Sequence, residues 1–445
     1  MMTGARGMIK NNIETDIKGK CIENGSAQEQ ESIMQTVKNT ITVSIKTNTH
    51  RGFIGWSSCD NICMDMHDCL DMCYGALAIY EYSAVLETAA YIFVSGVKLA
   101  SYADSSSGML TDVIMRTYEL IDSCTKAIEK QDKQIRDKAL TIIIKEAKKK
   151  AFDGWPDWRY ELLKCGVRLC DEKSAKKFEK SLDTMLDKEW DEYSSKYTKR
   201  EDLVVRYLLH RHLYGKESTH EELYKSLYIN ELRIIAVKDA LEDKNYDEAE
   251  KLCLEKAQEE SLYYRSSDPE DWNNLLFDIY RKSNNKDKQI TQAKKLLMMG
   301  NDVFWDVLKQ LYTDRGEWED KYIFLLDELK NGSRKSCYRS ILVAENEKKR
   351  LLEDLTENTW DLFNYGEYLA EDYPEQLYEL CYNVIRNNCA QAKDRREYRK
   401  VTSQIKQLIK WKGNEKAKIL IEELKQTYKR RPALLDELSK AEKKL

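Results

Sequence analysis

Residues 268–297 read DPEDWNNLLFDIYRKSNNKDKQITQAKKLL, a pattern that predicts two short amphipathic helices joined by a turn. The first helix is predicted to begin at Asp268-Pro269, because Asp can accept hydrogen bonds from free backbone amides and Pro is tolerated at the first helical position. Its apolar residues recur at helical spacing on one face; they are Trp272, Leu275, Leu276, Ile279 and Tyr280. Asn284-Asn285-Lys286 then interrupts the pattern, and a second amphipathic helix contains Ile290, Ala293, Leu296 and Leu297.

This hairpin pattern occurs three times between Ile229 and Leu329. The first copy turns at Asp243-Lys244-Asn245 and the third at Asp314-Arg315-Gly316. The copies are about 30 residues long, which is typical of stacked helical repeats. Because such short helices are marginal alone in water, we expect them to be stabilised by stacking on their neighbours. The Trp and Tyr residues near the helix starts are then packing seams between hairpins rather than platforms for a ligand.

Less regular helix pairs are expected on both sides of the repeats, including one that joins 360–369 to 377–385. Charged residues make up 34% of the 445-residue chain, which has only 4 Pro and 17 Gly, so helix is favoured nearly everywhere. We therefore predict an all-α protein, an α-solenoid of antiparallel TPR-like hairpins with an N-terminal helical bundle. The predicted parts are a mobile tail (1–30), the helical bundle (31–200) and the repeat array (201–445).

The chain has 73 Lys and Arg against 77 Asp and Glu, a net charge of −4, so the whole molecule is not predicted to attract nucleic acid. Lys145–Lys150 and Lys425–Arg431 are local basic patches that could touch phosphates. Acidic residues flank both, and a solvated helix face is the favoured interpretation. No apolar run is long enough to span a bilayer, and the first residues lack the apolar core of a secretion signal. These features predict a cytoplasmic location, no membrane association and reduced thiols for the 12 Cys.

Three segments resemble the helical C-terminal region of bacterial SWIM zinc-finger proteins, in order and in spacing. They are Arg51-Gly52-Phe53-Ile54, Asp104-Ser105-Ser106-Ser107-Gly108 and, most specifically, residues 428–438, YKRRPALLDEL. In that family a zinc module patterned Cys-x-Cys and then Cys-x-His precedes the helical region and contacts DNA or protein. This chain has neither pattern, and only Cys21 lies before residue 50, so no zinc ligand is carried over. The resemblance implies the TPR-like helical part without the finger, from about residue 50 to the C-terminus.

A metal site is the first hypothesis for the cluster Cys59, Cys63, His67, Cys69 and Cys73. On one helix the four Cys share a stripe with apolar residues, and Cys59 and Cys73 lie about 21 Å apart along the axis. That separation is far too long for four ligands around one zinc ion. We therefore predict that the Cys are small apolar core residues, with a two-ligand contribution from Cys63 and His67 as the alternative. No metal or other cofactor is assigned.

Two further segments could carry chemistry. Asp104–Gly108 is rich in oxygen-bearing side chains, but it is much shorter than a calcium-binding loop and is predicted to be a turn. Arg206 and His212 resemble the Arg and His spacing of all-helical HEPN ribonucleases. In an unbroken helix, however, residues i and i+6 are about 120° apart and are not neighbours. His210 and His212 also point in different directions, so no catalytic residue is assigned.

These observations leave three hypotheses about function. The first is a non-enzymatic helical-repeat scaffold or adaptor that binds a protein partner through its concave face. The second is a nucleic-acid-associated accessory protein that uses the local basic patches. The third is a HEPN-like, metal-independent ribonuclease.

Overall fold

The computed structural model describes residues 32–186, 192–261, 272–332 and 334–445. Within these ranges every regular element is a helix, which confirms the all-α prediction. None of the described helices is both long and apolar enough to cross a membrane. The predicted mobile tail and the predicted helix start at Asp268-Pro269 lie outside the described residues.

The chain divides into two compact units, residues 1–236 and 237–445. The division falls within α11 (Asn230–Glu242). Residue 200, where a domain boundary is predicted, lies inside α9 (Glu192–Ser218). That boundary stays a prediction, and the two units are described separately below.

Unit 1 is a helical bundle built around one strongly apolar helix, α4 (Tyr82–Leu99), which packs against α2, α3, α5 and α6. A helix that is apolar on most sides is stable only when other helices cover it. Gly96 permits the close approach of α5, because a Cβ atom there would lie 3.1 Å from Ile114. The other helices of this unit are α2 (Ile33–Asn48), α3 (Trp56–Ala78), α5 (Met109–Ile128), α6 (Lys133–Ala147), α7 (Pro156–Val167), α8 (Glu172–Leu186), α9 and α10 (His220–Lys225).

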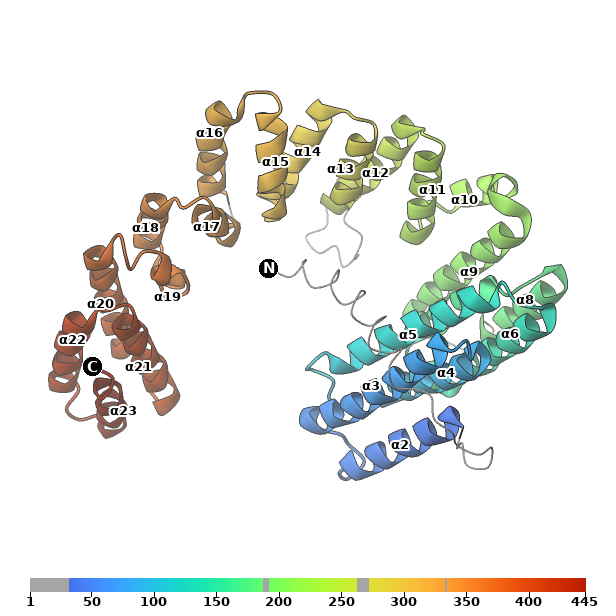
Figure 1. Cartoon of the computed structure of the whole chain (residues 1–445), viewed down its shortest axis with the longest axis horizontal. Coiled ribbons are helices and arrows are strands. Elements are labelled where there is room, and N and C mark those ends of the chain that lie inside the picture. Colours follow the sequence, from blue (N-terminus) through green and yellow to red (C-terminus); the bar gives the residue numbers. More distant parts are fainter. Residues whose placement is uncertain (1–31, 187–191, 262–271, 333) are drawn as a thin grey trace. The chain divides into compact units, whose positions relative to one another are not determined.

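Unit 2 begins with hairpins in which each helix packs on the next one in the chain, from α12 to α18 (Figure 1). Its last four helices, α20 to α23, pack on one another as a small bundle. The helices are α12 (Tyr246–Ser261), α13 (Trp272–Lys282), α14 (Lys286–Met298), α15 (Val303–Thr313), α16 (Trp318–Asn331), α17 (Lys335–Ala344), α18 (Lys348–Glu357), α19 (Leu362–Tyr365), α20 (Pro374–Gln391), α21 (Arg395–Lys410), α22 (Asn414–Thr427) and α23 (Pro432–Glu442). Packing of consecutive helices is the arrangement that a stack of helical hairpins requires.

The hairpin turns of unit 2 share one backbone conformation, which gives the sequence repeat a structural basis. In five of these turns a residue with positive φ ends the first helix, and the next N–H donates to the carbonyl five residues earlier; the positive-φ residues are Lys244, Asn284, Gly316, Asn346 and Lys412. This is the Schellman motif, which satisfies carbonyls left free at a helix end. The three turns predicted from the sequence are therefore confirmed.

Aromatic side chains pack both within and between these hairpins. Trp305 lies edge-on to Trp318 of its own hairpin, with ring centroids 5.4 Å apart, and Phe277 lies edge-on to Phe304 of the next hairpin at 5.0 Å. The seam between these two hairpins is therefore formed by Phe residues, whereas Trp305 and Trp318 pack within one hairpin. The predicted packing role is wrong at Trp360, which is 89% exposed. The helix predicted over 360–369 is also interrupted, because a 3₁₀ turn (Thr359–Asp361), α19 and a second 3₁₀ turn (Gly366–Tyr368) replace it.

Candidate interaction surfaces

The cysteine stripe of α3 is part of the core of unit 1. Cys59, Cys63, Cys69 and Cys73 are buried among apolar side chains, which confirms the prediction that they pack in the core. Burial raises the pKa of Cys69 to about 11 and that of Cys73 to about 12, because a thiolate is poorly solvated there. Neutral thiols are weak metal ligands and weak nucleophiles. Within the described ranges, no three His, Cys, Asp or Glu side chains are placed to share a metal ion.

His67 lies beside the stripe and faces a cation. Its Nδ1 atom is 3.2 Å from Arg116 Nη1. Burial, and then the charge of Arg116, lowers the pKa of His67. The lowered pKa favours the neutral form of His67. Its Nδ1 atom faces Arg116.

The segment Asp104–Gly108 forms the predicted turn. The Ser106 N–H donates to Asp104 Oδ1 at 3.1 Å, and the Gly108 N–H donates to the Ser105 carbonyl at 3.0 Å. The turn is joined to the segment 51–54, since the Asp104 N–H donates to the Ile54 carbonyl at 2.8 Å. Asp104 Oδ1 thus accepts a hydrogen bond from the backbone of the turn.

The residues of the ribonuclease hypothesis have separate partners. Arg206 donates from Nε to Asp202 at 2.6 Å and from Nη2 to Asp183 at 2.7 Å. His212 Nε2 lies 3.1 Å from the Cys170 carbonyl oxygen. Two carboxylates therefore neutralise the Arg206 guanidinium, and the imidazole of His212 contacts backbone.

An exposed aromatic surface lies where α3 ends and α4 begins. Tyr80 is 76% exposed and has a φ of 69°, and Ile79 beside it is also exposed. The ring of Tyr82 lies edge-on to that of Tyr80, with centroids 5.9 Å apart. These rings border a pocket of about 660 Å³; its lining residues are Tyr80, Glu81, Tyr82, Ser83, Ala84, Gln131 and Ile135. We call this region the Tyr80 surface.

The conformation of Tyr80 is unfavourable for a tyrosine. The Tyr80 N–H donates to Leu77 and the Glu81 N–H to Ala76, so Tyr80 occupies the position of a Schellman motif that Gly or Asn normally fills. A Cβ atom in this left-handed conformation costs about 1 kcal/mol or more. The exposed ring makes no core contact that offsets this cost.

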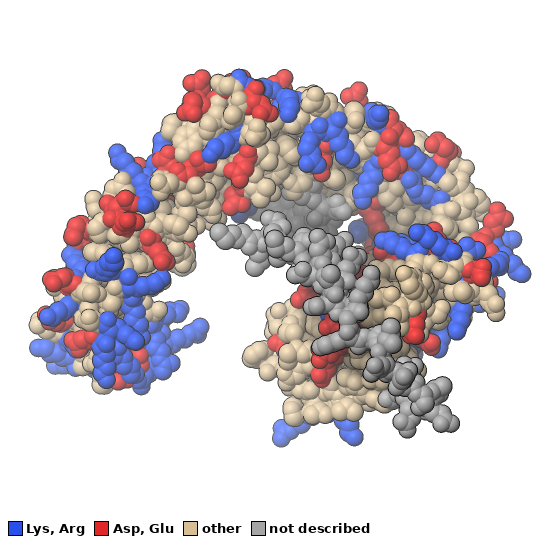
Figure 2. All heavy atoms as spheres, in the orientation of Figure 1, with Lys and Arg blue, Asp and Glu red and all other residues tan. Residues whose placement is uncertain are grey.

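The C-terminal end of the chain carries a concentration of positive charge. Residues 393–445 contain 17 Lys and Arg against 8 Asp and Glu, a net charge of +9, although the whole chain carries −4. Residues 1–392 therefore carry −13. Figure 2 shows Lys and Arg gathered over the end of the chain that Figure 1 labels α21 to α23.

Helix α21 presents five of these cations along one face. They lie within an arc of about 120° at 100° per residue, and all are exposed; they are Arg396, Arg399, Lys400, Lys406 and Lys410. We call this set the α21 ridge. The opposite face buries apolar residues, including Val401, Ile405 and Leu408. Glu397, the single acidic residue of α21, accepts from the Lys393 N–H at 2.5 Å.

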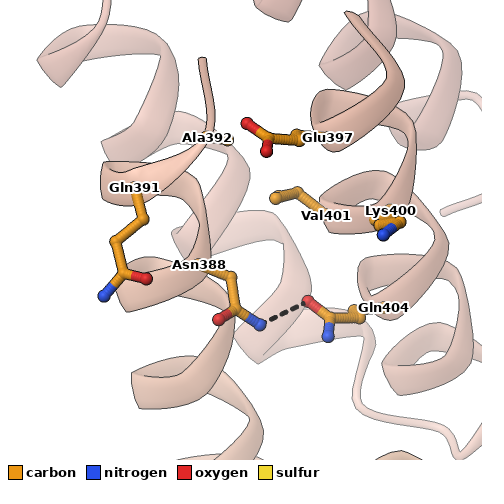
Figure 3. A pocket seen from close by; sticks show the side chains of 7 residues that line it. All are labelled: Asn388, Gln391, Ala392, Glu397, Lys400, Val401 and Gln404. Carbon is orange, nitrogen blue, oxygen red and sulfur yellow. Dashed lines mark hydrogen bonds between the residues drawn. The ribbon is translucent and has the colours of Figure 1, made fainter. Parts of the chain in front are cut away.

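A polar pocket of about 260 Å³ adjoins the ridge between α20 and α21 (Figure 3). Asn388 and Gln391 lie on the α20 side, and Glu397, Lys400 and Gln404 lie on the α21 side. The Asn388 amide donates to Gln404 Oε1 at 3.1 Å, which connects the two walls. Lys400 belongs to both the pocket and the ridge.

The two basic patches predicted from the sequence differ in their surroundings. Lys425 pairs with Glu442 at 2.6 Å, and Arg431 donates to the Ala392 carbonyl at 3.0 Å, so this patch partly stabilises the small bundle. In the other patch Lys149 pairs with Glu146, while Lys145, Lys148 and Lys150 are exposed. Sequence reasoning missed the α21 ridge, although cations at positions i, i+3, i+4 and i+10 of one helix were a readable signal.

No model of a known protein family matches this sequence, and no curated protein matches it.

Proposed function

We propose that this chain is a non-enzymatic helical-repeat scaffold or adaptor and that the Tyr80 surface docks a protein partner. The observation that carries the proposal is the strained and exposed conformation of Tyr80. Strain that the fold does not require is concentrated at functional sites. Replacement of Tyr80 by Gly would relieve it. Lys244 has the same backbone conformation in another turn, but among the described residues only at Tyr80 does this conformation hold an exposed aromatic ring beside a pocket, and an interaction outside the fold would explain that ring.

The chemistry of the surface suits a protein. Tyrosine is enriched among residues that contribute most to protein interfaces, where a ring packs in a pocket that a polar rim shields from water. Here Tyr80, Tyr82 and Ile135 provide apolar walls, and Glu81, Ser83 and Gln131 provide polar groups around them. The proposed partner places an apolar side chain in the pocket beside the two tyrosine rings and hydrogen-bonds to this rim.

The resemblance to the helical region of SWIM zinc-finger proteins belongs to the same proposal. Two of the three resembling segments, 51–54 and 104–108, are hydrogen-bonded to each other through Ile54 and Asp104. Their occurrence together therefore has a structural reason. We propose that the chain is an adaptor related to that helical region.

The substitution Tyr80→Gly tests the proposal. A loss of binding could not be attributed to unfolding, because this variant is expected to be more stable than the wild type. It should raise the free energy of unfolding by about 1 kcal/mol, because Gly adopts positive φ without strain. The matched control is Lys244→Gly, which makes the same change in a Schellman turn of unit 2, where Lys244 has a φ of 58°. Both variants should unfold at higher urea concentration than the wild type.

The full chain and both variants would then be used to isolate partners from the native host, with nuclease present. We expect a discrete protein on the wild type and on Lys244→Gly, and its loss from the more stable Tyr80→Gly. Equal recovery on all three chains would contradict the proposal. So would the loss of every protein on nuclease treatment.

A further inference from the structure

We infer that the α21 ridge binds the phosphate backbone of double-stranded nucleic acid. This site lies in unit 2 and is independent of the protein docking proposed for the Tyr80 surface. The inference rests on the spacing of the cations, on the lack of a carboxylate partner for three of the five among the described residues, and on the absence of aromatic or apolar side chains among them.

The spacing suits a duplex. Arg396 and Lys410 are 14 positions apart, so the ridge is about 21 Å long at 1.5 Å per residue. A duplex of that length carries about a dozen phosphates, at one charge per 1.7 Å of axis. The cations of a straight helix can therefore each reach a different phosphate.

The cations of the ridge are largely free to bind. Among the described residues, Arg396, Lys400 and Lys406 have no carboxylate within 4 Å. Arg399 pairs with Glu437 at 3.7 Å and Lys410 with Glu367 at 3.2 Å. The Lys410 pair is exposed on both sides, where an ion pair contributes little, so a phosphate can replace its carboxylate. The Arg399 contact is long, and its buried partner Glu437 also pairs with Arg395 and Lys440, so Glu437 keeps two cations when Arg399 turns to a phosphate.

The side chains of the ridge favour a duplex over a single strand. Proteins that bind single strands stack the bases on exposed aromatic rings. In and beside α21, all of which the structure describes, the aromatic residues are Tyr398 and Trp411, only 7% and 6% exposed. The ridge therefore offers charge without a stacking platform.

The same feature argues against an acidic protein as the ligand. Protein interfaces contain aromatic or apolar anchors inside a polar rim. The residues between the ridge cations are polar, namely the exposed Ser403 and the half-buried Gln407. Contacts to phosphates need no such anchor, since counterion release supplies the binding free energy.

The test measures binding of the full chain to a fluorescent duplex DNA by anisotropy, over a series of NaCl concentrations. The wild type should bind at low salt, and log K should fall against log [NaCl] with a slope of about −4 to −5 for five phosphate contacts. The variant Arg396→Gln/Lys400→Gln/Lys406→Gln should bind at least tenfold more weakly, with a slope shallower by about 3. Because these residues are exposed and unpaired, its thermal unfolding should match the wild type.

The matched control is Lys145→Gln/Lys148→Gln/Lys150→Gln, which removes the same charge from exposed lysines of unit 1. It should retain the affinity and slope of the wild type, as should Tyr80→Gly. A duplex RNA would show whether one kind of duplex is preferred, and ridge-dependent binding of either supports the inference.

Three results would overturn it. The first is no binding by the wild type at low salt, or equal loss in the ridge variant and its lysine control. The second is binding of a single strand as tight as that of the duplex. The third is displacement of the duplex by polyglutamate at equal charge concentration, which would indicate an acidic protein surface instead.

Discussion

At the residue scale, Arg339 is the buried charge on which the middle of unit 2 depends. It is 1% exposed and donates to Asp354 at 2.6 Å and to Asp361 at 2.5 Å. Arg339→Ala should lower the free energy of unfolding by about 3 to 5 kcal/mol, because buried Asp354 would lose its buried partner and keep only a contact with Lys335 at 3.8 Å. Arg350→Ala, which removes a more exposed pair with Asp327, should cost less than about 1 kcal/mol. Urea unfolding measures the stability of both variants. Equal losses of unfolding free energy would contradict the role given to Arg339.

The buried thiols of α3 predict a pH dependence. In the unfolded chain a thiol ionises near pH 8.5, whereas in the native protein the pKa is about 11 for Cys69 and about 12 for Cys73. Above pH 8.5 the unfolded state therefore binds fewer protons, and stability falls by roughly 1.4 kcal/mol per pH unit for each thiol. In urea unfolding from about pH 9 to 11, Cys69→Ala/Cys73→Ala should lose stability less steeply than the wild type. Parallel slopes would contradict the burial of these thiols.

At the element scale, the shared Schellman turn allows the contribution of Gly316 to the free energy of unfolding to be measured. Gly316 has a φ of 70°, and a Cβ atom there would meet no other atom within 4 Å. Gly316→Ala should therefore lower the free energy of unfolding by about 1 kcal/mol, entirely through backbone strain. Gly154→Ala is the control, because Gly154 has equal space and no positive φ. An unchanged urea midpoint for Gly316→Ala would show that the turn relaxes.

The same elements show what a sequence can predict about this fold. Apolar spacing and turn residues predict the hairpins of unit 2, because each one is encoded locally. The helix predicted over 360–369 fails because a distant contact decides its conformation. A Cβ atom at Gly366 would lie 2.5 Å from the ring of Trp411, so the chain bends closely around a residue of another hairpin. Apolar spacing alone does not reveal that contact.

At the scale of the whole molecule, net charge conceals a strong asymmetry. The total of −4 argues against nucleic acid, yet the last 53 residues carry +9 and expose five cations on one helix. The Tyr80 surface could not be predicted from the sequence for another reason. Exposure and positive φ depend on where α3 ends, and the sequence there, Ile-Tyr-Glu-Tyr, resembles any amphipathic helix. The Tyr80 surface therefore required the arrangement of helices, whereas the spacing of the ridge cations can be read from the sequence.

Photo-crosslinking at Tyr80 in the native host tests most directly whether the chain is a protein-binding scaffold. A photoreactive phenylalanine analogue would replace Tyr80 and, in a separate chain, the exposed Tyr228, which is 69% exposed and lies outside the Tyr80 surface. We predict a discrete crosslinked protein from position 80 that does not form from position 228. The absence of any adduct at position 80, or identical adducts at both positions, would contradict the proposal.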